Sequence, residues 1–166
     1  MPKPLDIHIH PSTREFMVDA IGPYMAATEA YFHTRIPVRT EEEMARELAD
    51  QGVRGVLLGW DAETNTGAPP IPNDWVARVV RDYPQVFVAG FAGVDPWKGK
   101  VALREIERAA RELGLRGLKF QQSAQAFFPN DRRFYPLWEK AQELGLIVLF
   151  HVGMTGMGAG GRGGMG

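Results

Sequence analysis

Apolar and polar positions along this chain follow two patterns, one typical of β-strands and one typical of α-helices. Short, largely apolar runs rich in Val, Leu, Ile and Phe occur around residues 53–59, 86–91, 115–120 and 146–151, and residues 5–10 alternate strictly between apolar and polar. Runs of this length and composition are typical of β-strands. The stretches between them have apolar residues at helical spacing, most clearly in residues 100–113, at Val101, Leu103, Ile106, Ala109, Ala110 and Leu113. The pattern predicts strands and helices in alternation.

Local signals place several of the helix boundaries. Thr40 followed by Glu43 matches a capping box, and it predicts a helix that begins there and ends at Gly52. Asn73 is a good N-cap for a helix that continues to Asp82. Further helices are expected over residues 23–34 and 131–144. Residues 11–39 form a long excursion after the first strand.

Three predicted helix ends share a pattern, in which a Glu-Leu pair is followed by a glycine and then by an apolar strand. The pair at 47–48 precedes Gly52 at a short distance, and the pairs at 112–113 and 143–144 directly precede Gly114 and Gly145. The last two recur after roughly 30 residues, about one eighth of a (β/α)8 barrel of roughly 250 residues. Apolar strands that alternate with helices indicate a parallel sheet covered by helices. A doubly wound sheet is the rival, but its glycine-rich phosphate loop does not follow the first strand. The sequence therefore predicts an α/β fold of the (β/α)8 TIM-barrel type, truncated after about five βα units.

The domain boundary is expected near the end of the fifth strand. Residues 1–152 would form the partial barrel, and residues 153–166 a glycine-rich loop or tail that is flexible because it has little to bury.

Composition excludes several classes of protein. The 166 residues are 45% hydrophobic and 23% charged, with a net charge of −1, which gives no electrostatic reason to expect nucleic acid or an anionic membrane as partner. There is no cysteine, so a metal site must use histidine, carboxylate or a modified lysine. No apolar stretch reaches the length of a signal peptide or a membrane span, and a cytoplasmic location is expected.

The first strand carries the main candidate site. Side chains of a strand point alternately to opposite faces, so Asp6, His8 and His10 share one face. Two imidazoles at positions i and i+2 can approach one metal ion, and His151 at the end of the fifth strand offers a third. The alternatives are a strand with one hydrated face, and for His151 a buried ring bonded to the backbone.

These motifs together resemble the amidohydrolase superfamily of metal-dependent barrel enzymes. The matching segments are Asp6-Ile7-His8-Ile9-His10-Pro11, Gly117-Leu118-Lys119-Phe120, Phe128-Pro129-Asn130-Asp131 and Val148-Leu149-Phe150-His151-Val152-Gly153. The last three are similar to the amidohydrolase-related branch that includes aminocarboxymuconate-semialdehyde decarboxylase. The resemblance covers the whole chain but only the first five eighths of such an enzyme.

The resemblance implies that His8, His10 and His151 are metal ligands, with zinc as the expected ion and manganese as an alternative. Active sites of such barrels lie at the C-terminal ends of the strands, where His10 and His151 are expected. The family also uses a histidine after strand six and an aspartate after strand eight, and neither is present in this sequence. His33 cannot be carried over to those roles and is expected on the surface of a helix.

Lys119, on the fourth strand, is the most ambiguous candidate. Neighbouring side chains of a strand point to opposite faces, and Leu118 and Phe120 are expected to face the helices. Lys119 is therefore predicted to point into the barrel. Because a buried ammonium group is costly unless paired, a partner is expected. Three roles remain open for Lys119: contact with substrate or a ligand shell, a structural ion pair, and carbamylation.

Other side chains on the loops are weaker candidates. Trp60, Phe127 and Phe128 could line a pocket for an apolar or aromatic substrate, although aromatic residues in loops more often pack the loop down. Arg14 and Arg35 are possible anchors for a carboxylate, although such arginines are usually solvated. Asp61 and Asp95 are expected to cap the next element or to form turns.

Metal-dependent hydrolysis, in which a metal-activated water attacks a carbonyl carbon, is the leading hypothesis for function. Non-oxidative decarboxylation of an aromatic or small acid on the same scaffold is the alternative, and a catalytically incomplete barrel fragment is the third. The expected partner is a small-molecule substrate, with homo-oligomers in the full-length form. The 166-residue polypeptide alone is expected to be catalytically silent and prone to associate.

Overall fold

Five parallel strands in the order β1-β2-β3-β4-β5 form the single sheet of the computed structural model, which describes residues 4–164. The strands are β1 (Leu5–Ile9), β2 (Arg54–Leu58), β3 (Phe87–Gly93), β4 (Gly117–Phe120) and β5 (Ile147–Phe150). The helices are α1 (Gly22–Phe32), α2 (Glu41–Asp50), α3 (Glu63–Thr66), α4 (Asn73–Asp82), α5 (Lys100–Arg111), α6 (Gln122–Gln125) and α7 (Tyr135–Glu143). Three short helical segments are labelled η1 (Glu15–Ala20), η2 (Pro96–Lys98) and η3 (Arg132–Phe134).

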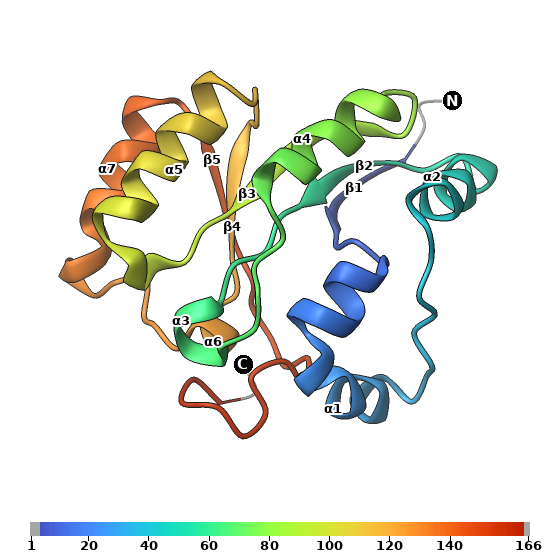
Figure 1. Ribbon diagram of the computed structural model, residues 1–166, viewed down its shortest axis with the longest axis horizontal. Coiled ribbons are helices and arrows are strands. Elements are labelled where there is room, and N and C mark those ends of the chain that lie inside the picture. The colour runs from blue at the N-terminus through green and yellow to red at the C-terminus, as the bar shows by residue number, and fades with distance from the viewer. Residues whose placement is uncertain (1–3, 165–166) are drawn as a thin grey trace.

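The sheet curls into a half-barrel with helices on its outer side (Figure 1). Buried side chains of α2, α4, α5 and α7 join one core cluster with the outward-facing residues of the strands, among them Met44, Val79, Ile106 and Leu137. The predicted fold class, a (β/α)8-type barrel truncated after five βα units, is confirmed.

A second, smaller cluster lies on the inner side of the sheet. Val56, Leu58 and Phe91 are buried together, with Ala89 and Leu149 packed against them. Their neighbours Leu57 and Leu118 belong to the outer cluster. This alternation is the expected result of strand geometry, and it separates a helix-facing surface from a concave one.

Irregular pairing and small residues accompany the curl of the sheet. The register shifts within both the β1–β2 and the β2–β3 pairs. A Cβ added at Gly93 would lie 2.2 Å from the backbone nitrogen of Trp60, and one at Gly59 would lie 2.4 Å from the backbone nitrogen of Gly93. Register shifts and close backbone contacts at glycine are the features with which sheets bend.

The predicted capping box at the start of α2 is confirmed. The Thr40 hydroxyl accepts a hydrogen bond from the Glu43 backbone N–H at 3.1 Å, and the Glu43 carboxylate accepts one from the Thr40 N–H at 2.8 Å. The helix ends before Gly52, whose φ of +68° is the left-handed conformation that glycine adopts most easily.

The prediction that Asn73 caps α4 is wrong. Asn73 is the first residue of the helix and has a different function in the fold. Its buried side-chain amide donates to the Gly93 carbonyl at 3.1 Å and accepts from the Gly93 N–H at 2.9 Å. The side chain therefore joins α4 to the end of β3, and a contact 20 residues away overrides the local capping preference.

The excursion after β1 contains one element that the sequence pattern does not predict. Residues Glu15–Ala20 form the π-helix η1, which packs beside α1. The expected helix over residues 23–34 corresponds to α1, and His33 is its exposed C-cap residue with a φ of 51°. The surface position expected for His33 is confirmed.

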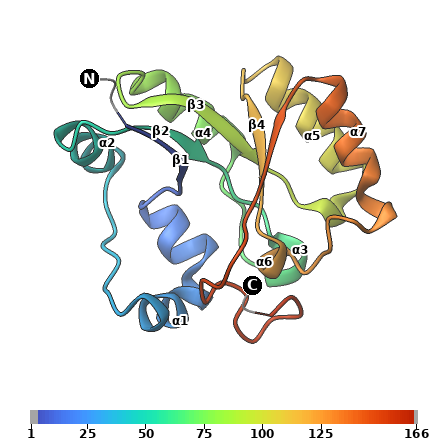
Figure 2. The ribbon, with the colours of Figure 1, turned by 180° about the vertical axis from the view of Figure 1, so that it is seen from behind.

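The glycine-rich segment after β5 lies against α1 and α6 (Figure 2). A Cβ at Gly156 would lie 2.8 Å from backbone atoms of Ala27 and Thr28, and one at Gly163 would lie 2.1 Å from the carbonyl oxygen of Ser123. Glycine is thus required where this segment touches the other loops. Its expected flexibility, and the domain division at residue 152, stay predictions.

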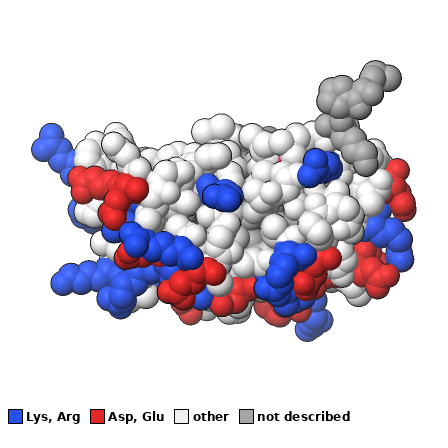
Figure 3. Space-filling view, turned by 90° about the horizontal axis from the view of Figure 1, so that it is seen from above, with Lys and Arg blue, Asp and Glu red and all other residues white. Residues whose placement is uncertain are grey.

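The two outer strands of the sheet expose apolar side chains. Leu5 and Ile7 on β1 are each 55% exposed, and Ile147 on β5 is 60% exposed. Within residues 4–164, β1 pairs only with β2, and β5 only with β4. Seen from above, charged side chains gather mainly along one rim of the molecule and leave much of the face uncharged (Figure 3).

No helix in the described part of the chain has the length and apolarity needed to cross a bilayer.

These edges predict that the 166-residue polypeptide self-associates. Unpaired strand edges with apolar side chains favour pairing with other chains, and a lysine on such an edge opposes it. We expect Ile7→Lys combined with Ile147→Lys to lower the average mass measured by analytical ultracentrifugation at concentrations on the order of tens of micromolar. Val101→Lys, on an equally exposed site of α5, is the control and should not change it. A monomeric unsubstituted chain would contradict this prediction.

Candidate metal centre

The structure brings His8, His10 and His151 together on the concave side of the sheet. The ring centroids of His8 and His10 are 5.1 Å apart, and those of His8 and His151 are 5.6 Å apart. Imidazoles whose nitrogens bind one ion at about 2.0–2.1 Å have ring centres roughly 5 Å apart. The two measured distances therefore bring the rings into one cluster, while their binding of a common ion stays a prediction.

The ring nitrogens also suit a metal chemically. Nδ1 of His10 and both ring nitrogens of His151 are buried without a well-formed hydrogen bond among the described residues, although the backbone of Gly153 interacts with the His151 ring and opposes the lowering of its pKa. Buried polar atoms are rarely left without a partner, and a divalent ion would satisfy them. In residues 4–164, however, no three His, Cys, Asp or Glu side chains are already arranged to hold an ion.

Desolvation keeps all three rings neutral near pH 7. Loss of water lowers the pKa of His8 to about 4, with smaller contributions from the charges of Lys119 and His151. The pKa of His10 is far below its usual value for the same reasons, and that of His151 is also lowered. Neutral imidazole is the form that binds metal.

Lys119 points into the half-barrel, as predicted from parity. It is 2% exposed, its charge lowers the pKa of all three histidines, and its neighbours Leu118 and Phe120 face the helices. The expected carboxylate partner is not found in the described part of the chain, where Nζ donates only to the Phe120 carbonyl at 3.1 Å. Burial lowers the pKa of Lys119 to about 8. A structural ion pair therefore does not account for this lysine.

Two aromatic residues surround His10. Trp60, which follows β2, is 3% exposed and meets the His10 ring edge-on at 5.9 Å. Phe16 stacks parallel to the same ring at 5.2 Å. The sequence predicted Trp60 near the site but missed Phe16, because η1 lacks the periodicity that would have identified it.

The other proposed substrate contacts are not assembled around the histidines. Phe128 is 77% exposed. Phe127 is buried and packs on Phe120 and Phe134, so it holds its loop down instead of lining a pocket. Arg14 is exposed and lines a shallow surface hollow with residues 39–42, and Arg35 is exposed beside His33.

Asp61 and Asp95 have the structural roles expected of them. Asp95 accepts hydrogen bonds from the backbone N–H groups of Trp97 and Thr64, at 2.9 and 2.7 Å. Asp61 pairs with Lys98 at 2.7 Å, although burial still raises its pKa. Both carboxylates thus fix the loops at the C-terminal ends of β2 and β3.

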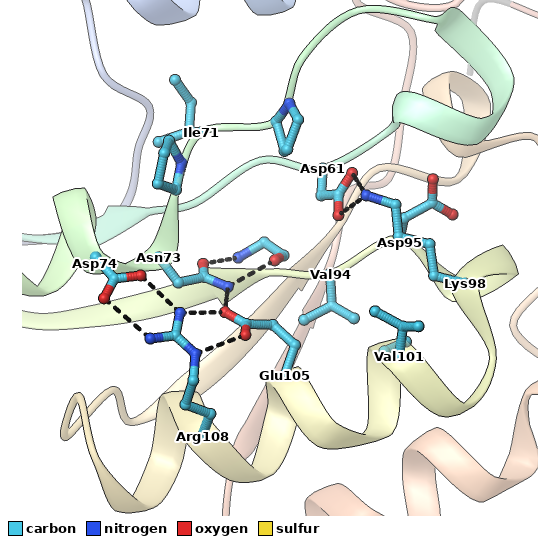
Figure 4. Close-up of a pocket in the computed structure, with 14 residues that line it drawn as sticks. Asp61, Ile71, Asn73, Asp74, Val94, Asp95, Lys98, Val101, Glu105 and Arg108 are labelled. Atoms are coloured by element: carbon cyan, nitrogen blue, oxygen red, sulfur yellow. Dashed lines mark hydrogen bonds and ion pairs between the residues drawn. The ribbon is translucent and has the colours of Figure 1, made fainter.

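A hollow of about 300 Å³ lies between these loops and α5, away from the histidines (Figure 4). Its charged groups are paired with each other: Asp61 with Lys98 at one end, and Arg108 with Glu105 and Asp74 at the other. Because these charges are neutralised within the wall, the hollow is a weaker candidate for chemistry than the histidine cluster.

Because Lys119 is buried, replacing it with an apolar residue is predicted to stabilise the folded chain. Without added metal, Lys119→Met should raise the free energy of unfolding at pH 7 on the order of 1–3 kcal/mol, because an unpaired buried ammonium is removed. The folded-state pKa, about 8, is below the unfolded value, so the unfolded chain binds more protons between these values. The wild type should therefore gain stability as the pH rises from 7 to 9, and the difference from the variant should shrink.

Urea unfolding at several pH values measures this effect. Lys100→Met, on the exposed start of α5, is the control and should change stability by less than about 0.5 kcal/mol. A marked loss of stability in Lys119→Met would show that the ammonium has a partner in solution.

Comparison with known proteins supports the assignment of the fold. A family model described as Amidohydrolase matches residues 61–163, more than half of the chain. The 2-amino-3-carboxymuconate-6-semialdehyde decarboxylase of Dictyostelium discoideum is 28% identical over 79 residues, which cover 48% of this chain and 22% of that protein.

Two solved structures show similar architecture at low identity. The 5-carboxyvanillate decarboxylase of Novosphingobium aromaticivorans, complexed with manganese and 4-hydroxy-3-methoxy-5-nitrobenzoic acid, is 19% identical with a TM-score of 0.65. The 4-oxalomesaconate hydratase of Rhodopseudomonas palustris is 21% identical with a TM-score of 0.56. They cover 92% and 89% of this chain, and it spans 51% and 52% of theirs. With the family model matching most of its length and five parallel strands curled into a half-barrel, the chain belongs to the amidohydrolase family.

Proposed function

We propose that His8, His10 and His151 bind a divalent cation, zinc or manganese, in the active site of a metal-dependent enzyme. The observation that carries this proposal is the convergence of three neutral imidazoles, of which His10 and His151 have buried nitrogens without a well-formed hydrogen bond in the described structure. An imidazole-rich site suits zinc, and the manganese in a structural neighbour supports that ion as well. When bound, the ion supplies a Lewis acid that holds and polarises an oxygen of the substrate.

The remaining inner residues favour a small anionic substrate. Lys119 is the cation beside the three rings, and its burial strengthens its attraction for a carboxylate. The substrate carboxylate would give Lys119 the anionic partner that it lacks in the described residues. Trp60 closes one side of the site behind His10 with an apolar surface.

Two reactions fit such a site. Non-oxidative decarboxylation is supported by the activities named for the Dictyostelium and Novosphingobium proteins. Hydrolysis at a carbonyl carbon is supported by the description of the family model. The chain spans about half the length of the solved neighbours, so the reaction proposed is that of the whole protein and not of this chain alone. We favour decarboxylation of a small carboxylic acid, with hydrolysis as the second candidate.

Metal binding to the purified 166-residue chain tests the site itself. We expect Mn²⁺ and Zn²⁺ to bind the wild type, and His8→Ala or His151→Ala to weaken binding by roughly ten-fold or more, since each variant loses one of three ligands. Titration calorimetry measures the affinities. His33→Ala, which removes an exposed histidine of α1, should bind like the wild type. Equal affinities in all four proteins would contradict the proposed ligand set.

The reaction is tested with the longest natural polypeptide that contains these residues. Loaded with Mn²⁺, it should release CO₂ from aromatic acids faster than it cleaves matched esters or lactones, and Lys119→Met should raise KM for the acids. Release of carboxylate and alcohol from esters without CO₂ formation would select hydrolysis instead.

A further inference from the structure

Three aromatic rings from three separate segments, those of His10, Phe16 and Trp60, pack against one another. Phe16 lies face to face with the imidazole, with an interplanar angle of 3° and ring centroids 5.2 Å apart. Trp60 approaches both rings edge-on, at 5.9 Å from His10 and 5.5 Å from Phe16. Phe16 is 1% exposed and Trp60 is 3% exposed, so the contact is sealed from water. Stacked and edge-to-face contacts of this kind restrict the orientation of a ring.

No hydrogen bond performs that task in the described structure. A metal-binding histidine commonly donates its second ring N–H to a carboxylate or carbonyl, which fixes the plane of the ring. Nδ1 of His10 is buried without a partner in residues 4–164, so no hydrogen bond at this nitrogen fixes the ring plane. Within the described part of the chain, His10 alone of the three histidines contacts aromatic residues other than histidine, while His8 contacts the rings of His10 and His151.

The backbone that carries Phe16 is itself unusual. The Ile21 N–H donates to the Phe16 carbonyl at 2.9 Å, across five residues, and this is the bond of a π-helix. The preceding turn is of α type, with the Met17 N–H bonded to the Thr13 carbonyl at 2.8 Å. π-Helical turns are rare and often occur at functional sites. Here the residue that stacks on His10 lies inside such an element.

We propose that Phe16 is a positioning residue that, together with Trp60, fixes the imidazole plane of His10 for metal binding by aromatic packing instead of by a hydrogen bond. This inference rests on the function proposed above. Phe16 touches neither the ion nor the substrate. It acts by limiting the orientations that the His10 ring can adopt.

The test compares ring-deleting and ring-retaining variants of the full chain. Phe16→Leu keeps an apolar side chain but removes the stacking surface, and we expect its Mn²⁺ affinity to fall about ten-fold. Bound Co²⁺ should show an altered visible absorption spectrum, because that spectrum reports coordination geometry. Phe16→Tyr keeps the ring, and its affinity and Co²⁺ spectrum should resemble those of the wild type.

Phe87→Leu is the matched control for a lost buried aromatic residue. Phe87 is also 1% exposed, but it has no aromatic contact with a histidine in the described residues. Its loss should lower stability in urea without changing the Co²⁺ spectrum. If Phe16→Leu does not fold, Phe16→Met, with a more adaptable side chain, replaces it.

The outcomes separate this inference from the proposed function. Wild-type binding with no change in Phe16→Leu would overturn the role of Phe16 and leave the metal site standing. Equal weakening in Phe16→Leu and Phe87→Leu would also overturn it, because general destabilisation would then be the cause. Absence of metal binding in the wild type would reject the proposed function and this inference with it.

Discussion

The curl of the sheet is the constraint on which the candidate site depends. A flat sheet with strands about 4.8 Å apart would place β1 and β5 roughly 19 Å from each other. The rings of His8 on β1 and His151 after β5 are nevertheless 5.6 Å apart, although three strands separate their own. Only a strongly curved sheet allows this. The shifted registers of β1–β2 and β2–β3, and the backbone contact of Gly93 with Trp60, therefore matter for function as well as for packing.

The alternation of side chains decides which groups enter the curved space. In the β4–β5 pair Lys119 lies opposite Leu149 and Phe120 opposite Phe150, so His151 emerges on the same side as Lys119. A slip of one residue would exchange this set for the helix-facing one. Desolvation on the inner side then lowers the pKa of the Lys119 ammonium and of the His151 imidazole. The same loss of water makes the ammonium unfavourable and keeps the imidazoles ready to bind a cation.

Sequence reasoning succeeded where a short pattern determines the outcome. The Thr40 capping box, the parity of Lys119 and the i, i+2 histidines depend on neighbours within a few residues, and the structure contains all three features. It failed where distant residues decide. Asn73 has the side chain of a cap, but the N–H and carbonyl of Gly93 at the end of β3 offer it two hydrogen bonds. Phe16 lies in a stretch without periodicity, so neither its π-turn nor its contact with His10 could be predicted.

The loops at the C-terminal ends of the strands are tied together independently of the sheet. The Gln125 amide donates to the carbonyls of Asp61 and Val94, at 2.7 and 2.9 Å, and accepts from the Gln121 N–H at 2.9 Å. One buried side chain thus connects the segments that follow β2, β3 and β4. The histidines, by contrast, come from β1 and β5, the two strands with an unpaired edge in residues 4–164. Hydrogen bonds therefore tie together the loops in the middle of the half-barrel, whereas the candidate ligands lie at its two edge strands.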